Sequence, residues 1–203
     1  AEPQLLVEAL SQRGNELADT QLAHILTLGV APYTDPKLEH GFRHNALFIG
    51  PNVREAVAEG RADLTPIFLS EVPRLFQRGK LPIDVALIQV SPPDEHGFCS
   101  YGVSVDVTKA AAESARYVVA EINPKMPRTL GNCFIHISRI NALVPSEMTI
   151  LEAAAGEIDE VAQSIGEHIT ELIQDGSTLQ LGIGTIPDAV LSCLGSKKDL
   201  GVH

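Results

Sequence analysis

The sequence contains no tryptophan, few aromatic residues and only three cysteines among its 203 residues. Cys99, Cys133 and Cys193 form no CxxC pair, so they predict neither a disulfide framework nor a zinc site of the usual spacing. Unpaired cysteines fit a reducing compartment, and we therefore expect a cytoplasmic protein. Aromatic residues make up 4% and hydrophobic residues 44% of the chain, which predicts a mainly aliphatic core.

Long apolar runs and an excess of positive charge are also missing. No apolar run approaches the roughly 20 residues of a membrane span. The polar and acidic start, Ala1–Gln4, does not resemble a secretory signal. The formal net charge of −11 argues against a basic surface of the kind that binds nucleic acid. We therefore expect a protein whose partners include neither membranes nor nucleic acids.

Strand-like and helix-like segments alternate along the chain, which predicts an α/β fold with an open, mostly parallel sheet and helices on both faces. The expected helices are residues 3–17, 52–59, 70–76, 108–115 (with Thr108 as N-cap) and 158–172. The expected strands are residues 22–28, 45–49, 64–69, 83–90, 117–122 and 179–181. Residues 137–158 show no clear pattern and are expected to form a crossing loop. Because ligands bind beyond the carboxyl ends of parallel strands, we expect the loops after Leu28, Val90 and Leu181 to meet.

The most informative stretch is Leu179–Leu191, which predicts a strand, a glycine loop and a helix. Gly182 and Gly184 permit a sharp turn and place no side chain in the way of a ligand, and Pro187 suits the first helical position. The free amides of the loop would then point at a substrate oxygen. The stretch matches neither a Walker A motif nor GxGxxG, and the charge of Asp188 would repel a polyphosphate. A carbonyl that becomes an oxyanion suits the loop better, and the alternative is a turn whose glycines serve packing alone.

The loop of residues 91–102 follows the strongest predicted strand and is stiffened by two prolines. Asp94, Glu95 and His96 resemble an acid/base or metal cluster. However, three consecutive side chains on one turn rarely converge on one ion, so we expect no metal. The alternative is a simple turn in which Asp94 bonds to the backbone. The candidates for substrate contact in this loop are Ser91, Pro92, Glu95, His96 and Gly97.

A second pair of candidates, Arg43 and His44, precedes an apolar strand. One interpretation is contact with a carboxylate or phosphate of the substrate, and the other is a basic pair at the surface where a strand begins. Cys99 is a candidate nucleophile, but only His96 is close enough in sequence to lower the pKa of its thiol. A buried, inert thiol is the favoured interpretation of Cys99.

Residues 42–54, 65–76, 90–104 and 179–190 closely resemble the acetyl-CoA hydrolase/transferase family, especially its 4-hydroxybutyrate CoA-transferase-like members. The resemblance implies a NagB/RpiA/CoA-transferase-like α/β fold. It also implies acyl-CoA and a free carboxylic acid as substrates, with coenzyme A as a substrate and no permanently bound cofactor. The implied reaction is covalent and proceeds through a glutamyl-CoA thioester. The implied contacts to coenzyme A and the oxyanion are Gly182, Ile183, Gly184, Thr185 and Ile186.

The nucleophilic glutamate of the family follows a segment that resembles residues 198–203, so we expect it just after His203. Glu147, Glu152 and Glu157 stand in the wrong context for that role. The resemblance thus implies that residues 1–203 are a single N-terminal domain, truncated at both ends and inactive alone. Its expected partners are a C-terminal domain and a second subunit. The alternatives are an acetyl-CoA hydrolase, a non-catalytic acyl-CoA-binding module and, more weakly, a sugar-phosphate isomerase, which would need a Lys/Arg phosphate site that the sequence does not show.

Overall fold

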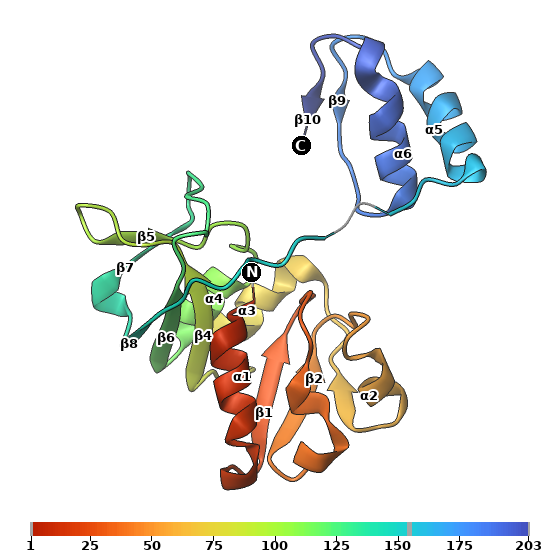
Figure 1. The fold of residues 1–203 in the computed structure, drawn as a ribbon. Coiled ribbons are helices and arrows are strands. Elements are labelled where there is room, and N and C mark those ends of the chain that lie inside the picture. Colours follow the sequence, from red (N-terminus) through yellow and green to blue (C-terminus); the bar gives the residue numbers. More distant parts are fainter. Residues whose placement is uncertain (1, 154–155, 203) are drawn as a thin grey trace. The chain divides into compact units, whose positions relative to one another are not determined.

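The computed structural model describes residues 2–153 and 156–202 (Figure 1). The chain forms two compact units, residues 1–152 (unit 1) and residues 153–203 (unit 2). Each unit has its own helices and its own parallel strands. In the described part of the chain, no helix has the length and apolar composition needed to cross a lipid bilayer. The expectation of one domain over residues 1–203 stays a prediction.

Unit 1 contains two parallel sheets of three strands each. The first sheet has the order β1 (Thr20–His24), β2 (Phe42–Ala46), β3 (Ala62–Leu64). The second has the order β4 (Val85–Val90), β6 (Tyr117–Ile122), β8 (Ala142–Pro145). In the second sheet Leu87 lies opposite Val119, and Val119 lies opposite Ala142. The expected α/β fold with mostly parallel strands is confirmed, and the parallel strands of unit 1 are divided between two sheets instead of one.

Helices flank the strands of unit 1 (Figure 1). They are α1 (Gln4–Gln12), α2 (Arg54–Ala58), α3 (Val72–Gln77) and α4 (Thr108–Ser114). Short 3₁₀ turns are η1 (Gly14–Glu16), η2 (Pro32–Thr34), η3 (Pro36–Leu38), η4 (Leu69–Glu71) and η5 (Ile137–Arg139). The core between α4 and the second sheet includes Ile88, Val118 and Ala112, which are all at least 96% buried. Most of β4 therefore lies inside the unit, although its first residue, Val85, is 50% exposed.

A buried carboxylate helps to fix α1 on the second sheet. Glu121 on β6 has no exposed surface, and its Oε2 accepts a hydrogen bond from the Leu5 N–H at 3.1 Å. Its Oε1 accepts a hydrogen bond from Nε2 of Gln89 on β4 at 3.1 Å. The Leu5 N–H lies in the first turn of α1, where no intrahelical acceptor exists. The sheet thus caps the helix through a carboxyl oxygen of Glu121, placed at the end of the helix where the dipole is positive.

Two strands depart from the parallel pattern. β5 (Phe98–Ser100) and β7 (Phe134–His136) pair antiparallel, with Cys99 opposite Ile135. β5 begins eight residues after Val90, the last residue of β4. The pair therefore fixes the far end of the loop that follows β4.

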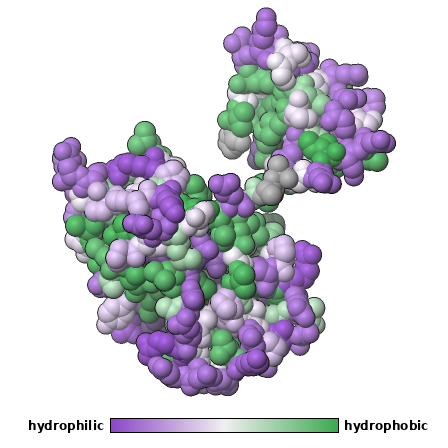
Figure 2. All heavy atoms as spheres, in the orientation of Figure 1, coloured by the Kyte–Doolittle hydropathy of each residue, from purple (hydrophilic) through white to green (hydrophobic). Residues whose placement is uncertain are grey.

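Unit 2 contains α5 (Glu160–Leu172), β9 (Thr178–Leu179), α6 (Thr185–Cys193), η6 (Leu194–Ser196) and β10 (Gly201–Val202), and β9 and β10 pair in parallel. Asp159 caps α5, because its carboxylate accepts a hydrogen bond from the Ala162 N–H at 2.7 Å. A Cβ atom at Gly166 of α5 would lie 2.9 Å from the backbone of Ala189 of α6, so glycine permits the close approach of the two helices. Apolar side chains remain at the surface of this unit (Figure 2), and Ile183 is 88% exposed.

Several expected element boundaries in unit 1 were wrong, and two of them have a clear physical reason. The strand expected at residues 64–69 ends at Leu64, because Pro66 has no N–H to donate to a ladder. Thr108 is the first residue of α4 and not its N-cap, which is Val107. The Thr108 N–H and hydroxyl both donate to Oδ1 of Asp106, at 2.9 and 3.0 Å. Asp106 therefore supplies the acceptor for the N–H group of Thr108, the first residue of the helix.

The expected crossing loop of residues 137–158 was wrong in part, because it contains the strand β8. Its four residues are too few to show a strand period, and Pro145 closes it. The expected strands 22–28 and 45–49 are found at Thr20–His24 and Phe42–Ala46. The expected strand 117–122 is confirmed as β6.

Candidate functional site

The glycine loop of unit 2 joins β9 to α6. Gly184 is the N-cap of α6 and has φ 129° and ψ 175°, a backbone conformation that favours glycine. A Cβ atom at Gly184 would meet nothing within 4 Å, so the dihedral angle and not crowding calls for glycine here. At Gly182 a Cβ atom would meet only Cγ of Pro187, at 3.9 Å, which is an ordinary contact. Close packing therefore does not account for either glycine.

The amides at the start of α6 are available to a ligand. The N–H groups of Thr185 and Ile186 have no intrahelical acceptor, and among the described residues no backbone carbonyl accepts from them. Both residues are exposed, as are Ile183 and Gly184. Pro187 was expected at the first helical position, but it is the third helical residue because the helix begins at Thr185. It still lies in the first turn, where its missing N–H costs no helical hydrogen bond.

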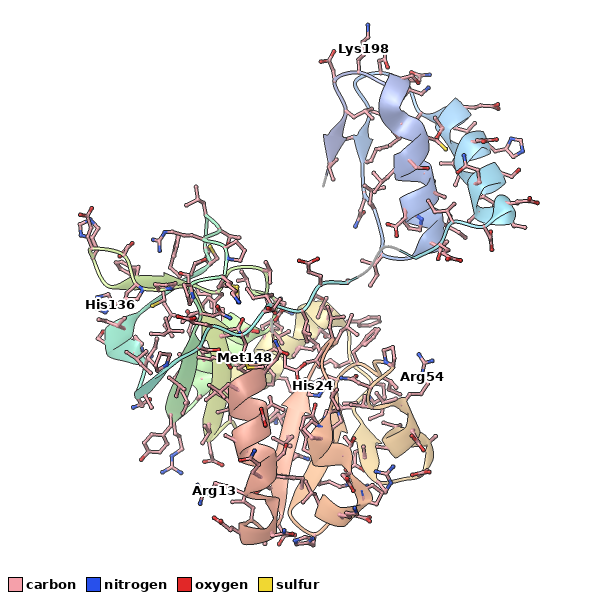
Figure 3. The ribbon with its side chains drawn as sticks, in the orientation of Figure 1. Arg13, His24, Arg54, His136, Met148 and Lys198 are labelled. Atoms are coloured by element: carbon pink, nitrogen blue, oxygen red, sulfur yellow. The ribbon has the colours of Figure 1, made fainter. Side chains whose placement is uncertain are left out.

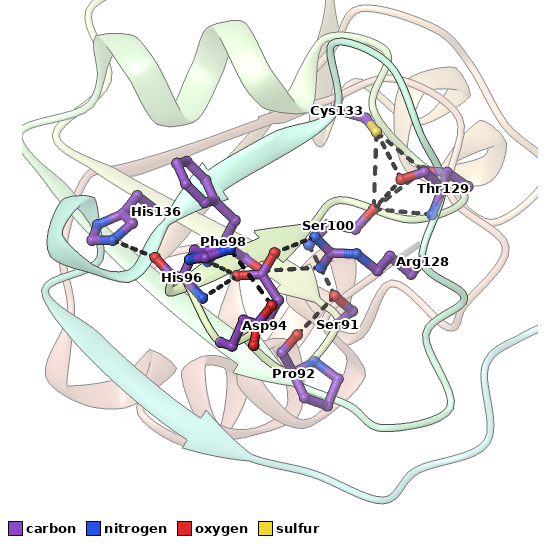
Figure 4. Close-up of polar contacts among 11 residues, drawn as sticks. Ser91, Pro92, Asp94, His96, Phe98, Ser100, Arg128, Thr129, Cys133 and His136 are labelled. Carbon is purple, nitrogen blue, oxygen red and sulfur yellow. Dashed lines mark hydrogen bonds and ion pairs between the residues drawn. The ribbon is translucent and has the colours of Figure 1, made fainter.

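The loop after β4 in unit 1 is held by its own polar groups (Figure 4). Oδ1 of Asp94 accepts hydrogen bonds from the N–H groups of His96 and Phe98, at 3.0 and 2.8 Å. The Gly97 N–H donates to the Asp94 carbonyl at 2.9 Å, and Gly97 has φ 81°. These bonds lower the pKa of the Asp94 carboxyl, the one from Phe98 most. The turn with Asp94 bonded to the backbone, one of the two interpretations of this loop, is thus present in the structure.

The candidate residues of this loop fall into two groups. Ser91 is 97% buried, and its Oγ accepts a hydrogen bond from the Ser100 N–H at 2.9 Å, so its hydroxyl helps to hold the loop. Pro92, Glu95 and His96 are exposed. The Glu95 and His96 side chains lie at the tip, 3.6 Å apart between Oε1 and Nε2. Glu95 and His96 are therefore exposed to solvent on a turn that hydrogen bonds hold in place.

Arg43 and His44 do not converge, because they are neighbours on β2 and their side chains point to opposite faces of the sheet. Arg43 makes a two-bond ion pair with Asp63, at 2.8 and 2.6 Å, and a third bond of 3.0 Å to the Gly60 carbonyl. This pairing raises the pKa of the Arg43 guanidinium and lowers that of the Asp63 carboxyl. Arg43 thus already has a carboxylate partner inside the unit.

His44 belongs instead to a buried aromatic cluster that the sequence did not reveal. Its ring stacks on His24 with 4.3 Å between centroids, and Nε2 of His24 lies 2.5 Å from the Tyr33 hydroxyl (Figure 3 labels His24). Nε2 of His44 has no partner among the described residues. His44 is one of the residues that line a cavity of about 10 Å³, with Tyr33 and Arg61 among the others, which is about the space of one water molecule. Burial lowers the pKa of His44 to about 4, and the nearby His24 adds to the lowering.

Cys99, the candidate nucleophile of the sequence, lies in the core of unit 1. Cys99 has no exposed surface, and burial raises the pKa of its thiol, which agrees with the interpretation as an inert thiol. Within residues 2–153 and 156–202, no three His, Cys, Asp or Glu side chains gather as metal ligands would.

Arg128 is a site residue that sequence reasoning missed. It lies in the loop after β6 and bonds to Asp94 and to the Phe98 carbonyl (Figure 4). The rule that loops at the carboxyl ends of parallel strands lie together would have directed attention to this loop. The pairing with Asp94, 34 residues away, has no local sequence signal.

Comparison with known proteins matches the chain to the N-terminal domain of a family of acetyl-CoA hydrolases and transferases and to several CoA transferases. The sequence model of the acetyl-CoA hydrolase/transferase N-terminal domain matches residues 1–173. A 4-hydroxybutyrate coenzyme A transferase of Clostridium kluyveri is 52% identical over 202 residues, which cover 100% of this chain and 47% of that protein. A succinyl-CoA:acetate/propanoyl-CoA:succinate CoA transferase of Fasciola hepatica is 48% identical over 206 residues, 100% of this chain and 43% of that protein.

Solved structures show the same fold. RipA from Yersinia pestis matches with a TM-score of 0.91 and 30% identity over 100% of this chain and 50% of its own. A 4-hydroxybutyrate CoA-transferase from Porphyromonas gingivalis matches with a TM-score of 0.72 and 37% identity over 97% of this chain and 52% of its own. The chain spans about half the length of the relatives that it matches.

Proposed function

The chain belongs to the acetyl-CoA hydrolase/transferase family, and on this premise we propose that it takes part in the transfer of coenzyme A from an acyl-CoA to a free carboxylic acid. The observation that carries the proposal is the 52% identity to a 4-hydroxybutyrate coenzyme A transferase along the entire chain. The Fasciola hepatica relative is a CoA transferase as well. The N-terminal half of such an enzyme is the role that the sequence supports best.

The proposed reaction proceeds by covalent catalysis on a glutamate. A carboxylate oxygen of the glutamate attacks the thioester carbonyl, coenzyme A leaves as thiolate, and a mixed acyl-glutamyl anhydride forms. The thiolate then attacks the glutamyl carbonyl, which releases the first acid as carboxylate and leaves a glutamyl-CoA thioester. The second acid reverses these steps and leaves as the new acyl-CoA, so no proton or electron is consumed overall.

Each attack passes through a tetrahedral oxyanion, and this is the step that the glycine loop suits. Ile183, Gly184, Thr185 and Ile186 are exposed residues, and their N–H groups can donate to the oxyanion and to coenzyme A, while Pro187 has no N–H to donate. Preorganised backbone donors of this type contribute roughly 3–4 kcal/mol each to the stabilisation of a transition state. The open surface at Gly182 leaves room for the thioester to approach the backbone.

The loop after β4 is proposed as a substrate contact in its own right. Its exposed tip carries Glu95 and His96, and its turn at Gly97 is fixed by hydrogen bonds. A tip held in this way loses little conformational entropy when a ligand binds. We therefore propose that the tip contacts a polar part of the substrate.

We propose that the nucleophilic glutamate lies outside these residues, since the relatives are about twice as long as this chain. On this view the chain alone does not transfer coenzyme A. Coenzyme A acts as a substrate, and no cofactor stays bound. A homodimer is the proposed assembly, to be checked by light scattering. The cytoplasm is the proposed location, because the free thiols of Cys99, Cys133 and Cys193 suit a reducing compartment.

The test is a hybrid in which this chain replaces the aligned residues of the Clostridium kluyveri relative. The hybrid is expected to convert acetyl-CoA and 4-hydroxybutyrate to acetate and 4-hydroxybutyryl-CoA. Mass spectrometry measures these products. With acetyl-CoA alone, the intact protein should gain a covalent adduct at the glutamate. The parent relative and the chain alone are the controls.

A folded hybrid without transfer, beside an active parent, would overturn the proposal. Transfer by the chain alone would show that the glutamate need not come from elsewhere. Rapid acetyl-CoA cleavage by the hybrid without any carboxylic acid would favour the hydrolase, because that reaction requires water to reach the anhydride.

A further inference from the structure

Arg128 ties together the loops that follow two neighbouring strands of the second sheet, β4 and β6. Its Nη2 lies 2.5 Å from Oδ2 of Asp94, and its Nη1 donates to the Phe98 carbonyl at 3.0 Å. Its guanidinium carbon also lies 4.7 Å from the centroid of the Phe134 ring on β7. Three different segments therefore contact one guanidinium group, and the bonds to Asp94 and Phe98 are drawn in Figure 4.

The carboxylate of Asp94 is shared between the loop and Arg128. Oδ1 accepts from the His96 and Phe98 N–H groups, and Oδ2 faces Arg128. Without the guanidinium, Oδ2 of the Asp94 carboxylate would lose the ion pair that it makes with Arg128. The shape of the tip and the position of Arg128 are thus linked through a single side chain.

The residue after Arg128 anchors the same segment from the other side. The Thr129 N–H donates to Oγ of Ser100 at 3.2 Å, and the Thr129 hydroxyl donates to the Gly102 carbonyl at 3.0 Å. The backbone that carries Arg128 is therefore bound to β5 and to the residues that follow it. Hydrogen bonds therefore fix both the backbone next to Arg128 and the guanidinium group of its side chain.

We infer that Arg128 is a positioning residue, which fixes the Glu95–His96 tip of the loop through Asp94 and Phe98 so that the tip meets the substrate in one orientation. The part of this inference that concerns the substrate rests on the proposed function. Arg128 acts through Asp94 and does not itself touch the reacting atoms.

Arginine is required for this role by its shape as well as by its charge. Its planar fork reaches two acceptors at once and also lies over the Phe134 ring. Lysine would keep the charge opposite Asp94 but would lose the second bond and the planar contact with the ring. Arg128→Lys is therefore expected to restore part of what Arg128→Gln removes.

The first experiment measures amide hydrogen exchange on the chain as it is. In Arg128→Gln, the amides of His96, Gly97 and Phe98 should exchange at least about 10-fold faster, and in Arg128→Lys by less, because local opening becomes easier. The matched control is Arg116→Gln, which removes an exposed ion pair with Asp84, 3.2 Å long, and should leave these amides unchanged. A urea melt of each variant separates local opening from global unfolding.

The second experiment measures steady-state kinetics in the hybrid. Arg128→Gln should raise KM for acyl-CoA by about 10-fold and lower kcat less, since binding and not the chemical step is affected. Asp94→Asn should behave similarly, and the double variant should be hardly worse than either single one, because both act through one contact. Arg116→Gln should match the hybrid without substitution.

Unchanged exchange at residues 96–98 in Arg128→Gln would overturn the positioning role. So would an active hybrid in which Arg128→Gln and Arg116→Gln have the same KM and kcat. A hybrid without substitution that transfers nothing would overturn the proposed function instead, and the exchange rates would then decide the role of Arg128 in the loop by themselves.

Discussion

The loop after β4 and the glycine loop differ in how far their polar groups are already hydrogen-bonded. In the loop after β4, polar groups are paired within the unit. Asp94 accepts hydrogen bonds from two loop amides and pairs with Arg128, and the buried Ser91 accepts a hydrogen bond from the Ser100 N–H. In the glycine loop, by contrast, the N–H groups of Thr185 and Ile186 have no backbone acceptor among the described residues, and both residues are exposed.

The difference indicates how each loop can serve a ligand. A loop whose polar groups are already paired offers shape and exposed tips, and it contributes through preorganisation. A helix start with free amides offers hydrogen bonds directly to a developing negative charge. Disturbing the first loop should therefore affect binding and local order, whereas disturbing the second should affect the chemical step.

The largest effect is expected from Gly184→Val in the hybrid. Valine at φ 129° is strained and should displace the amides of the α6 start, so kcat should fall by about 100-fold or more. Gly195→Val is the control, because a Cβ atom there meets nothing within 4 Å and its φ is not in the left-handed region. A kcat for Gly184→Val within two-fold of the control would show that the glycine loop is only structural.

The next prediction concerns acid pH, which should lower the free energy of unfolding through His44 in the His24–His44 stack of unit 1. The pKa of His44 falls from 6.5 to about 4 on folding, so the unfolded state binds the proton first as pH falls. The stability contribution is complete above pH 6.5 and is lost on the way down to pH 4, with about 2 kcal/mol gone at pH 5. Urea unfolding followed by circular dichroism at pH 7 and pH 5 measures this loss.

His44→Leu should flatten this pH dependence, whereas His96→Gln, at an imidazole whose side chain is 74% exposed, should leave it unchanged. Burial also lowers the pKa of His24, so a smaller dependence of the same sign should remain in His44→Leu. An equal loss of stability in His44→Leu and in the wild-type chain would contradict the assignment to His44.

A smaller effect is expected from Gly97→Ala, which tests how tightly the loop after β4 is closed. Gly97 has φ 81°, and a Cβ atom would lie 2.7 Å from Nε2 of His136. The free energy of unfolding should fall by about 1–3 kcal/mol. Gly79→Ala is the matched control, since its φ is also positive at 63° but nothing lies within 4 Å. Equal losses in the two variants would mean that the stability of the loop does not depend on the contact between Nε2 of His136 and the His96 carbonyl, which are 3.1 Å apart.

The smallest effect is expected from Arg43→Gln in the hybrid. Arg43 pairs with Asp63 at the surface, and exposed ion pairs contribute little to stability. KM for acyl-CoA should change by less than about two-fold, because Arg43 already has its carboxylate partner. A clearly larger rise of KM would support the alternative in which Arg43 binds a carboxylate of the substrate.

Elements with a strong local pattern could be predicted from the sequence. The apolar run of β6 and the 3.6-residue period of α5 placed both elements, and the glycines before Thr185 placed the turn at the start of α6. The four-residue strand β8 could not be predicted, because it becomes a strand only beside β6. Elements of that length carry too few residues for a period.

The candidate site was predictable in the same uneven way. The glycine loop and the turn at Asp94 are local, so residue type and spacing pointed to them. The contact between Arg128 and Asp94 and the stack of His24 on His44 join residues 34 and 20 positions apart. Such pairs depend on which strands become neighbours, and that is decided by the packing of the whole unit.

The central claim is that the amides at the start of α6 bind the acyl-CoA. Amide hydrogen exchange of the hybrid, with and without a saturating acyl-CoA, tests it most directly. We predict that exchange slows at Gly184, Thr185 and Ile186 when acyl-CoA is bound, and that it does not slow at these residues in Gly184→Val. Unchanged exchange at these three amides in a hybrid saturated with acyl-CoA would contradict the claim.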